Sequence, residues 1–459
     1  MEYMALYLFI AVCLVLLIGF PVAFSLAGTA LAFAGIGMMI GHFDASFLHA
    51  IPNRLFGIVS NTILMAVPLF IFMGVMLEKS KVAENLLDAM ALMMGKTKAG
   101  MGIAVTLVGM LLAASTGIVG ATVVTMGLLA LPTMLKRGYS AQYSSGIIAA
   151  TGSLGQIIPP SIALVLLGDV LSSSYQQAQL NMGIFSPETI SIADLFAGAM
   201  IPGLILVLLY IIYSFVLAIF KPEQVPCLLD EDIEYIKSRK SVSVFAALVP
   251  PLLLIFCVLG SILFGVATPT EAAGVGAFGA SILAIWQKQF TLVNLQDVMR
   301  QTLKITAMVF MILIGASIFS LVFRGFGGEE LIAGFFEQLP GGVVSAVLIV
   351  MLVMFLLGFI LDFIEITFVV VPIVAPILLM MGVDPIWLGI MIAVNLQTSF
   401  LTPPFGFALF YLRGVAPKSV LTSDIYKGVI PFIIMQLFLL ILMSVYPKVV
   451  TWLPDLLYP

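Results

Sequence analysis

The sequence predicts an all-α polytopic membrane protein made of two inverted repeats, each with one re-entrant helical hairpin and one broken transmembrane helix. Three observations predict this fold class. Of 459 residues, 62% are hydrophobic and 9% are charged, which leaves too little polar surface to cover a soluble domain. Apolar runs of about 20 residues, the length of one bilayer crossing, alternate with short charged stretches. Residues that interrupt helices recur at one constant spacing in the two halves of the chain.

The first repeat is expected to cover residues 1–220. Its scaffold and arm take residues 1–99, where apolar runs near 3–20, 22–40 and 60–78 each match one span. The next apolar stretch is too long for one span and has small or polar residues at its midpoint, which predicts a hairpin. The elements that follow the arm are the hairpin at 100–135, a broken helix at 144–171 and an unbroken helix at 195–220.

The charged segment 221–242 is predicted to be a cytoplasmic linker, and the second repeat follows at 243–459. By the same reasoning its elements are a scaffold and arm at 243–342, a hairpin at 343–382, a broken helix at 385–412 and a helix at 429–447. Three charged stretches predict amphipathic helices at the membrane surface, namely 78–98, 288–304 and 417–428.

The repeat is visible in the helix-breaking residues. Four of them recur with an offset of 244 residues: Pro132, Gly138, Pro159 and Pro160 match Pro376, Gly382, Pro403 and Pro404. If each half makes five crossings, the second half starts on the opposite face of the membrane. An odd number of crossings per repeat therefore predicts inverted topology.

The distribution of basic residues tests this threading, because cytoplasmic loops are enriched in Lys and Arg. With the predicted spans, 16 of the 19 Lys and Arg residues fall on one face, and Arg54, Arg324 and Lys448 fall on the other. The first face is therefore expected to be cytoplasmic. Both termini would then lie on the periplasmic side of the membrane, and the two hairpins would enter the membrane from opposite faces.

The chain breaks at membrane depth are where chemistry is expected, since irregular backbone is tolerated there only if it is buried or lines a cavity. Segments 151–160 and 395–404 each end in Pro-Pro, which removes two donors and frees carbonyls in the preceding turn. A small cation such as Na⁺ would suit these oxygens, while half-helix N-termini at the same depth favour an anion. The alternative is a proline kink satisfied by neighbouring helices.

A few charged residues need separate interpretation, because charge inside a membrane is costly and usually functional. Asp362 at the second hairpin tip is expected either to line a substrate cavity or to cap a half-helix. Glu365, one turn later, is expected to have no ligand role and could equally face water, and Glu271 is expected to cap a helix start. Arg54 and Arg324 could attract an anion or could snorkel to the interface. The candidates for the substrate cavity are Ser115, Thr122, Asp362, Asn395, Gln397 and Arg54.

An enzyme is not indicated. Neither His42 nor His49 is placed with a partner for catalysis, and no HExxH, Ser/His, Cys/His or paired-carboxylate pattern lies at membrane depth. The three cysteines do not imply a disulfide framework. No basic block suggests nucleic-acid binding.

Several short runs, weak alone but specific in this order, resemble the large membrane subunit (DctM-like) of tripartite ATP-independent periplasmic (TRAP) transporters over essentially the whole chain. They read Gly19-Phe-Pro-Val-Ala-Phe24, Pro68-Leu-Phe-Ile-Phe-Met-Gly74, Ser153-Leu-Gly-Gln-Ile-Ile-Pro-Pro-Ser161, Ala267-Thr-Pro-Thr-Glu-Ala-Ala273 and Leu401-Thr-Pro-Pro-Phe-Gly406. The resemblance implies an elevator-type secondary transporter in a bacterial or archaeal cytoplasmic (inner) membrane. It would import a small organic acid anion, a carboxylate or sulfonate, with Na⁺ as coupling ion and no other cofactor.

The resemblance also implies two Na⁺ sites made largely of backbone carbonyls, each between a hairpin tip and the broken span of the same half. Carried onto this chain, the first site would use Ala113, Thr116, Gly155, Ile158 and Pro160, and the second Gly358, Ser399, Thr402 and Phe405. One departure concerns the first tip, where Ile118 and Gly120 replace a serine and a proline of many relatives. This chain therefore lacks the hydroxyl with which that serine would contact substrate, whereas backbone ligation is unaffected.

The partners implied by the resemblance are a small four-helix membrane subunit and an extracytoplasmic substrate-binding protein. The alternative in mechanism is a stand-alone Na⁺-coupled dicarboxylate symporter that works without a binding protein. Omitting the binding protein from a transport assay distinguishes the two.

Overall fold

The computed structural model describes residues 3–94, 97–227 and 244–458, apart from the side chains of residues 115, 116 and 244. Over these residues every regular element is a helix. Most of the predicted cytoplasmic linker falls outside the described residues.

The first half of the chain contains a run of single helices followed by two interrupted segments. The helices up to residue 94 are α1 (Met4–Leu17), α2 (Val22–Met39), the short η1 (Ala45–Ala50), α3 (Ile51–Ser60), α4 (Ala66–Lys79) and α5 (Val82–Met94). They are followed by α6 (Gly100–Thr116), α7 (Val119–Lys136), α8 (Ala141–Ser153), η2 (Leu154–Gln156), α9 (Ile162–Asn181), α10 (Ile192–Phe220) and η3 (Pro222–Gln224).

The second half repeats this order. Its single helices are α12 (Val244–Leu263), α13 (Pro269–Trp286), α14 (Leu292–Gly325) and α15 (Gly328–Glu337). The interrupted segments and the last helices are α16 (Gly342–Leu357), α17 (Phe363–Val369), α18 (Val371–Met380), α19 (Pro385–Leu401), α20 (Phe407–Val415), α21 (Thr422–Val445) and α22 (Lys448–Leu457).

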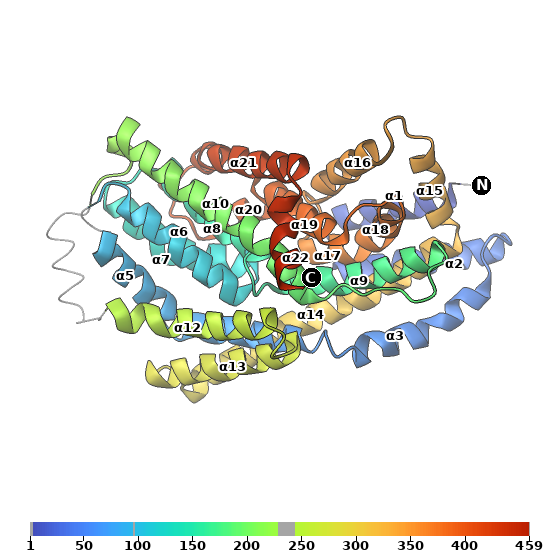
Figure 1. Ribbon diagram of the computed structural model, residues 1–459, viewed down its shortest axis with the longest axis horizontal. Coiled ribbons are helices and arrows are strands. Elements are labelled where there is room, and N and C mark those ends of the chain that lie inside the picture. Colours follow the sequence, from blue (N-terminus) through green and yellow to red (C-terminus); the bar gives the residue numbers. More distant parts are fainter. Residues whose placement is uncertain (1–2, 95–96, 228–243, 459) are drawn as a thin grey trace.

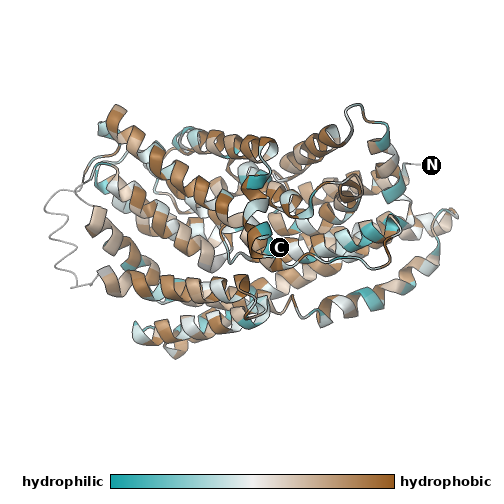
Figure 2. Ribbon diagram, viewed as in Figure 1, coloured by the Kyte–Doolittle hydropathy of each residue, from teal (hydrophilic) through white to brown (hydrophobic). Residues whose placement is uncertain are grey.

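Six of the described helices are long and apolar enough to cross a membrane: α2, α7, α10, α12, α14 and α21. The consecutive pair α17–α18, bent by 57°, would be a seventh span. Large apolar side chains on these helices point outward, for example Leu208 on α10 and Phe256 on α12, which are 56% and 73% exposed. Figure 2 shows apolar residues along the outer helices α10, α12 and α21. The protein is therefore a multi-pass membrane protein, as its composition predicts.

The two interrupted regions approach each other in the middle of the molecule. The α6–α7 pair and the segment from α16 to α18 reach the centre from opposite ends, and α19 lies between them (Figure 1). The α10 end that precedes residue 221 lies at the opposite end of the molecule from the N-terminus (Figure 1). Whether the two hairpins stop partway through a membrane, and which face the termini occupy, stay predictions.

Glycine allows the closest helix contacts around this centre. Helix α8 crosses α21 where Gly146 faces the carbonyl of Gly428, and Gly428 in turn faces the carbonyl of Gln142. Helix α14 crosses α2 in the same way, with Gly315 against the backbone of Ala23. A side chain at any of these glycines would meet backbone atoms, which cannot move aside cheaply. Small residues are the usual means of such close packing between membrane helices.

Two surface segments differ from the prediction. Residues 288–304 were expected to form an amphipathic helix separate from the following span, but α14 runs without interruption from Leu292 to Gly325. The charged residues Asp297, Arg300 and Lys304 do not end a helix, because none of them removes a backbone donor or strains the backbone. Residues 422–428 of the predicted segment 417–428 likewise form the first turns of α21.

Candidate functional site

The first interruption lies between α8 and α9. Pro159 and Pro160, joined by a cis peptide bond, cannot donate backbone hydrogen bonds. Ser161 stabilises the start of α9, because its hydroxyl accepts from the Leu164 N–H (3.5 Å) and donates to the carbonyl of Gly155 (2.8 Å). A buried side chain, and not a continuous helical ladder, therefore joins the two helices.

The tip between α6 and α7 packs against this interruption. Gly117 adopts a left-handed conformation (φ +61°), and its N–H donates to the carbonyl of Ala113 (2.9 Å). A methyl group placed on Gly155 would lie 3.4 Å from the same Ala113 oxygen. The structure thus brings together Ala113 and Gly155, two residues of the first predicted Na⁺ site.

The remaining residues of that site lie nearby in the chain. Ile158 donates its N–H to the Leu154 carbonyl (2.9 Å) and directs its side chain towards Gly203 of α10, and Pro160 is buried. Thr116 ends α6, and its side chain lies outside the described residues. Binding of Na⁺ by this set stays a prediction.

The second interruption repeats the first between α19 and α20. Pro403 and Pro404 are joined by a cis peptide bond, and Thr402 precedes them in extended conformation. The Thr402 carbonyl accepts from the Gly406 N–H (3.0 Å), and its hydroxyl donates to the Thr398 carbonyl (2.8 Å). Phe405 is 55% exposed.

The end of α16 packs against this second interruption. A methyl group on Gly358 would lie 2.5 Å from the hydroxyl oxygen of Ser399, which donates to the Phe355 carbonyl (2.7 Å). One turn earlier, the amide of Asn395 donates to the Met351 carbonyl (2.8 Å). Gly358 and Ser399 are thus in contact, and their role as Na⁺ ligands stays a prediction.

The two interruptions meet each other at one buried contact. The side-chain amide of Gln397 donates to the hydroxyl of Ser153 (3.3 Å), and these residues are 244 positions apart in the chain. Residues that correspond in the repeat therefore touch, which is expected only close to the axis that relates the two halves. The side-chain oxygens of Gln397 and of Gln156, which belongs to the first interruption, are both buried without a hydrogen-bond partner among the described residues.

The second hairpin tip is built around a pair of carboxylates. Asp362 precedes α17, and its carboxylate accepts from the Phe363 N–H (2.8 Å). The carboxylate of Glu365 accepts from the Asp362 N–H (2.9 Å), which completes a capping box. Glu365 does not face water, one of the alternatives for this residue, since it is 8% exposed. Glu365 is buried because its carboxylate accepts from the backbone N–H of Asp362, which precedes α17.

A small cavity of about 60 Å³ lies between the two tips. The first tip contributes Gly117 and Ile118, the second contributes Asp362 and Phe363, and Gln156 lines the cavity from the first interruption. Phe400, Phe407 and Tyr411 complete its wall, and Ile71 of α4 with Ile305 and Val309 of α14 close one side. The volume holds a few water molecules only.

The charge pattern at this cavity comes from backbone and not from basic side chains. Among the described residues that line it, Asp362 is the ionisable group apart from the phenol of Tyr411. Helices α7 and α20 begin at the cavity, and no side chain caps either start. The first N–H groups of a helix lack internal partners and carry partial positive charge. Two uncapped helix starts therefore face the same small space.

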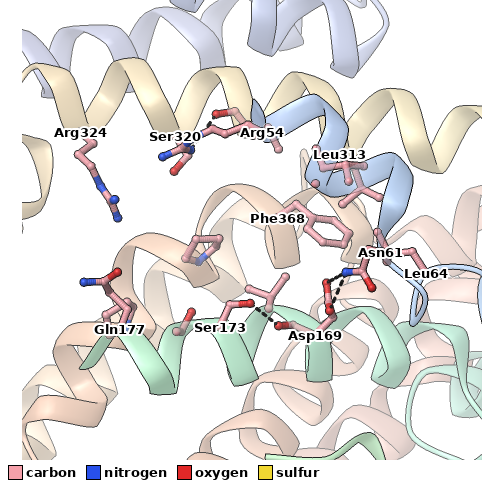
Figure 3. A pocket seen from close by; sticks show the side chains of 18 residues that line it. Arg54, Asn61, Leu64, Asp169, Ser173, Gln177, Leu313, Ser320, Arg324 and Phe368 are labelled. Carbon is pink, nitrogen blue, oxygen red and sulfur yellow. Dashed lines mark hydrogen bonds between the residues drawn. The ribbon is translucent and has the colours of Figure 1, made fainter. Parts of the chain in front are cut away.

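The other predicted cavity residues lie elsewhere. Thr122 is buried within α7, where its hydroxyl lies 3.2 Å from the Ile118 carbonyl, and the amides of Asn395 and Gln397 are used between helices. The side chain of Ser115 lies outside the described residues. The structure does not place Arg54 at the cavity between the tips. Arg54 lines a different cavity with Arg324, because α3 carries it away from both tips (Figure 3).

Sequence reasoning missed Gln156 and Tyr411 as cavity residues. Gln156 lies within the Gly-Gln-Ile-Ile-Pro-Pro run, so a buried amide beside a chain break was a signal that could have identified it. Tyr411 reaches the cavity only because α20 packs on α7, where a methyl on Gly120 would lie 2.9 Å from its ring. No local pattern indicates this contact.

Comparison with known proteins gives consistent results. The sequence model of the tripartite ATP-independent periplasmic transporter DctM component matches residues 9–449. The C4-dicarboxylate TRAP transporter large permease protein DctM of Vibrio cholerae is 28% identical over 98% of this chain and 97% of its own. The isethionate TRAP transporter permease protein DctMQ of Oleidesulfovibrio alaskensis is 29% identical over 95% of this chain, which spans 64% of that relative. The crystal structure of the Alcanivorax borkumensis YdaH transporter has the same fold, with a TM-score of 0.62 at 13% identity, over 88% of this chain and 90% of that one.

Proposed function

Because this chain belongs to the DctM component family of tripartite ATP-independent periplasmic transporters, we propose that it imports a small organic anion into the cell, driven by a Na⁺ gradient. The observation that carries the proposal is the pair of uncapped helix starts, α7 and α20, at a cavity lined by no basic side chain. Half-helix N-termini at membrane depth are a known means of binding anionic groups.

The substrate class follows from this geometry and from the relatives. Two helix starts on one small cavity suit a compact group with two or three acceptor oxygens, such as a carboxylate or a sulfonate. The names of the two relatives specify a C4-dicarboxylate and isethionate, and both have such a group. Asp362 makes the cavity unfavourable for an anion on its own, because a like charge lies in its wall.

Bound cations offset that repulsion, and here we place the coupling. The predicted Na⁺ sites lie where Gly155 contacts Ala113 and where Ser399 contacts Gly358, directly behind the two tips. With Na⁺ in both sites, each tip carries a positive charge at the moment the anion arrives. Without Na⁺, the repulsion from Asp362 is offset only by the partial positive charges at the starts of α7 and α20. Anion binding therefore requires the ions.

Transport requires the tips to separate from the single helices. The cavity of about 60 Å³ is closed on one side by Ile71, Ile305 and Val309, whose apolar side chains form no hydrogen bonds that would hold them to the tips. We propose that the two interrupted regions slide as one unit along this apolar contact, in an elevator motion. In the proposed complex, an extracytoplasmic binding protein delivers the anion and a small membrane subunit braces the single helices. The longer isethionate relative DctMQ, of which this chain spans 64%, supports the small membrane subunit as a partner.

Uptake by proteoliposomes tests this function. Vesicles containing this chain, its small subunit and its binding protein are expected to accumulate intact labelled substrate only under an inward Na⁺ gradient. Unchanged uptake after replacement of Na⁺ by choline would contradict the coupling. Uptake that persists without the binding protein would favour a stand-alone symporter instead. Recovery of a chemically altered product inside the vesicles would contradict transport as the function.

A further inference from the structure

A second and larger cavity, of about 390 Å³, lies between the single helices and the interrupted ones. Its walls are α3, α9, α14 and the α17–α18 pair, and it shares no lining residue with the cavity between the tips. Its volume is within the range of small-molecule sites, about 300–1,000 Å³. Figure 3 shows Arg54 and Arg324 on one side of this cavity, with Asp169, Ser173 and Gln177 of α9 on the other.

The two arginines are only partly satisfied by their surroundings. Arg54 donates to the Ser317 carbonyl (3.3 Å) and forms no ion pair with a described carboxylate. Arg324 uses two of its three nitrogens on one oxygen of Glu329 (2.8 and 2.6 Å). Both side chains are partly buried, so water compensates their charge incompletely.

The single carboxylate in the wall is already occupied. Both oxygens of Asp169 accept from the side-chain amide of Asn61 (3.1 and 3.2 Å), at the end of the cavity away from Arg324 (Figure 3). The lining therefore carries two guanidinium groups and one carboxylate, which lies at the Asn61 end of the cavity, away from Arg324. A guanidinium presents several donors in a plane and suits carboxylate and sulfonate oxygens.

A snorkelling role explains these arginines poorly. Snorkelling places the charged end of a side chain at the lipid surface, whereas Arg54 donates across to α14 within the cavity wall. Arg324, one of the three basic residues expected on the outer face, lines the same cavity. Two arginines that line one cavity indicate a ligand of negative charge.

We propose that this cavity is a separate anion-binding site, in which Arg54 and Arg324 hold a small carboxylate or sulfonate on its way to the cavity between the tips. The assignment of that anion as transported substrate rests on the proposed function, whereas the binding of an anion by Arg54 and Arg324 is independent of it. The site would raise the local concentration of substrate anions at the outer opening.

Cysteine labelling tests the site without any transport. In the full chain with its small subunit, Cys13, Cys227 and Cys257 are replaced by Ala, and Ser320→Cys is introduced in the cavity wall. Rates of modification are measured with an anionic probe, sulfonatoethyl methanethiosulfonate, and with its cationic trimethylammonium counterpart. The ratio of the two rates reports the local potential, and Ser173→Cys on the opposite wall is a second reporter position.

Replacing the arginines by Gln is expected to lower the anion-to-cation rate ratio roughly tenfold for each arginine removed. Loss of a nearby unit charge changes each rate by about threefold, in opposite directions for the two probes. Lys448→Gln removes an exposed charge predicted to lie on the same face, and it should leave the ratio within about twofold. The double Arg→Lys variant, which preserves charge, should keep most of the ratio. Millimolar succinate or isethionate should slow labelling only where the arginines are present.

An unchanged ratio in the double Gln variant, or a reporter cysteine that neither probe reaches, would overturn the site. Labelling that follows the arginines but is not slowed by either soluble anion would also overturn it, and would assign the arginines to lipid phosphate. None of these results depends on Na⁺ or on uptake. Failure of Na⁺-driven transport is therefore a separate result.

Discussion

Gly358→Ala is the substitution whose effect follows most directly from the proposed ion sites. The added methyl would lie 2.5 Å from the hydroxyl oxygen of Ser399 and 2.9 Å from its Cβ. An ordinary carbon–oxygen contact needs about 3.4 Å, so the Ser399 side chain must move by roughly 0.9 Å. Its hydroxyl would then lose the Phe355 carbonyl, to which it donates at 2.7 Å.

The expected cost is about 1–3 kcal/mol, the usual range for adding one methyl group to a packed site. If this cost falls on the Na⁺-bound arrangement, the Na⁺ concentration for half-maximal uptake rises roughly fivefold to 150-fold. Gly155→Ala is the matched control in the first half. Its methyl would meet the Ala113 oxygen at 3.4 Å, an ordinary contact, so a shift of no more than about threefold is expected.

The assay has two readings on the same purified protein. Na⁺-dependent uptake gives the half-saturating concentration, and thermal unfolding at increasing Na⁺ gives an independent measure, since bound ligand stabilises the folded state. Both should show weaker Na⁺ dependence for Gly358→Ala, with full recovery at high Na⁺. Equal Na⁺ dependence in Gly358→Ala, Gly155→Ala and the unsubstituted protein would refute the placement of an ion beside Ser399.

Two further substitutions test the packing and the second tip. Gly428→Ala should lower stability by about 1–3 kcal/mol, because its methyl would meet the Gln142 carbonyl where α8 crosses α21. Gly274→Ala on α13, which meets open space, should leave the melting temperature unchanged or slightly raised, and equal melting temperatures for both variants would contradict the close crossing. Asp362→Ala should cost about 1 kcal/mol of stability through loss of the α17 cap, whereas Asp362→Asn should restore most of it, since Asn also accepts from the Phe363 N–H. Equal stability of the two Asp362 variants, measured by thermal unfolding, would show that the cap contributes nothing.

The chain interruptions were predictable because backbone chemistry determines them. Two Pro-Pro pairs at an offset of 244 residues, each preceded by small or hydroxyl residues, interrupt the chain after α8 and after α19. Proline interrupts a helix whatever its neighbours are. The contact between Ala113 and Gly155 and that between Gly358 and Ser399 join residues that the family resemblance implied for the two Na⁺ sites. The two pairs also obey the repeat, with offsets of 245 and 244 residues.

Helix continuity was predicted less well, because charge and helix ends are different signals. Residues 288–304 are charged enough to lie outside lipid, yet α14 passes through most of them unbroken for lack of a proline or glycine. The helix α3 was not expected, although Pro52 in its first turn is a common helix-start residue. Pro52 is therefore the sequence signal from which the start of α3 can be predicted.

Side chains that meet through tertiary packing could not be predicted from the sequence. Arg54 and Arg324 are 270 positions apart, and only the packing of α3 along α14 brings them to one cavity. Tyr411 reaches the tip cavity through the contact of α20 with α7. The burial of Glu365 was readable in principle, because its spacing from Asp362 is that of a capping box.

The most direct test of the account is simultaneous measurement of ²²Na⁺ and labelled substrate entering the same proteoliposomes. The two proposed carbonyl sites predict that substrate with its binding protein stimulates Na⁺ uptake, with at least about two Na⁺ ions per anion. Substitution at Gly358 should reduce this stimulated Na⁺ uptake at low Na⁺ more than substitution at Gly155. Na⁺ uptake that substrate does not change would contradict the central claim that the anion and the ions bind together.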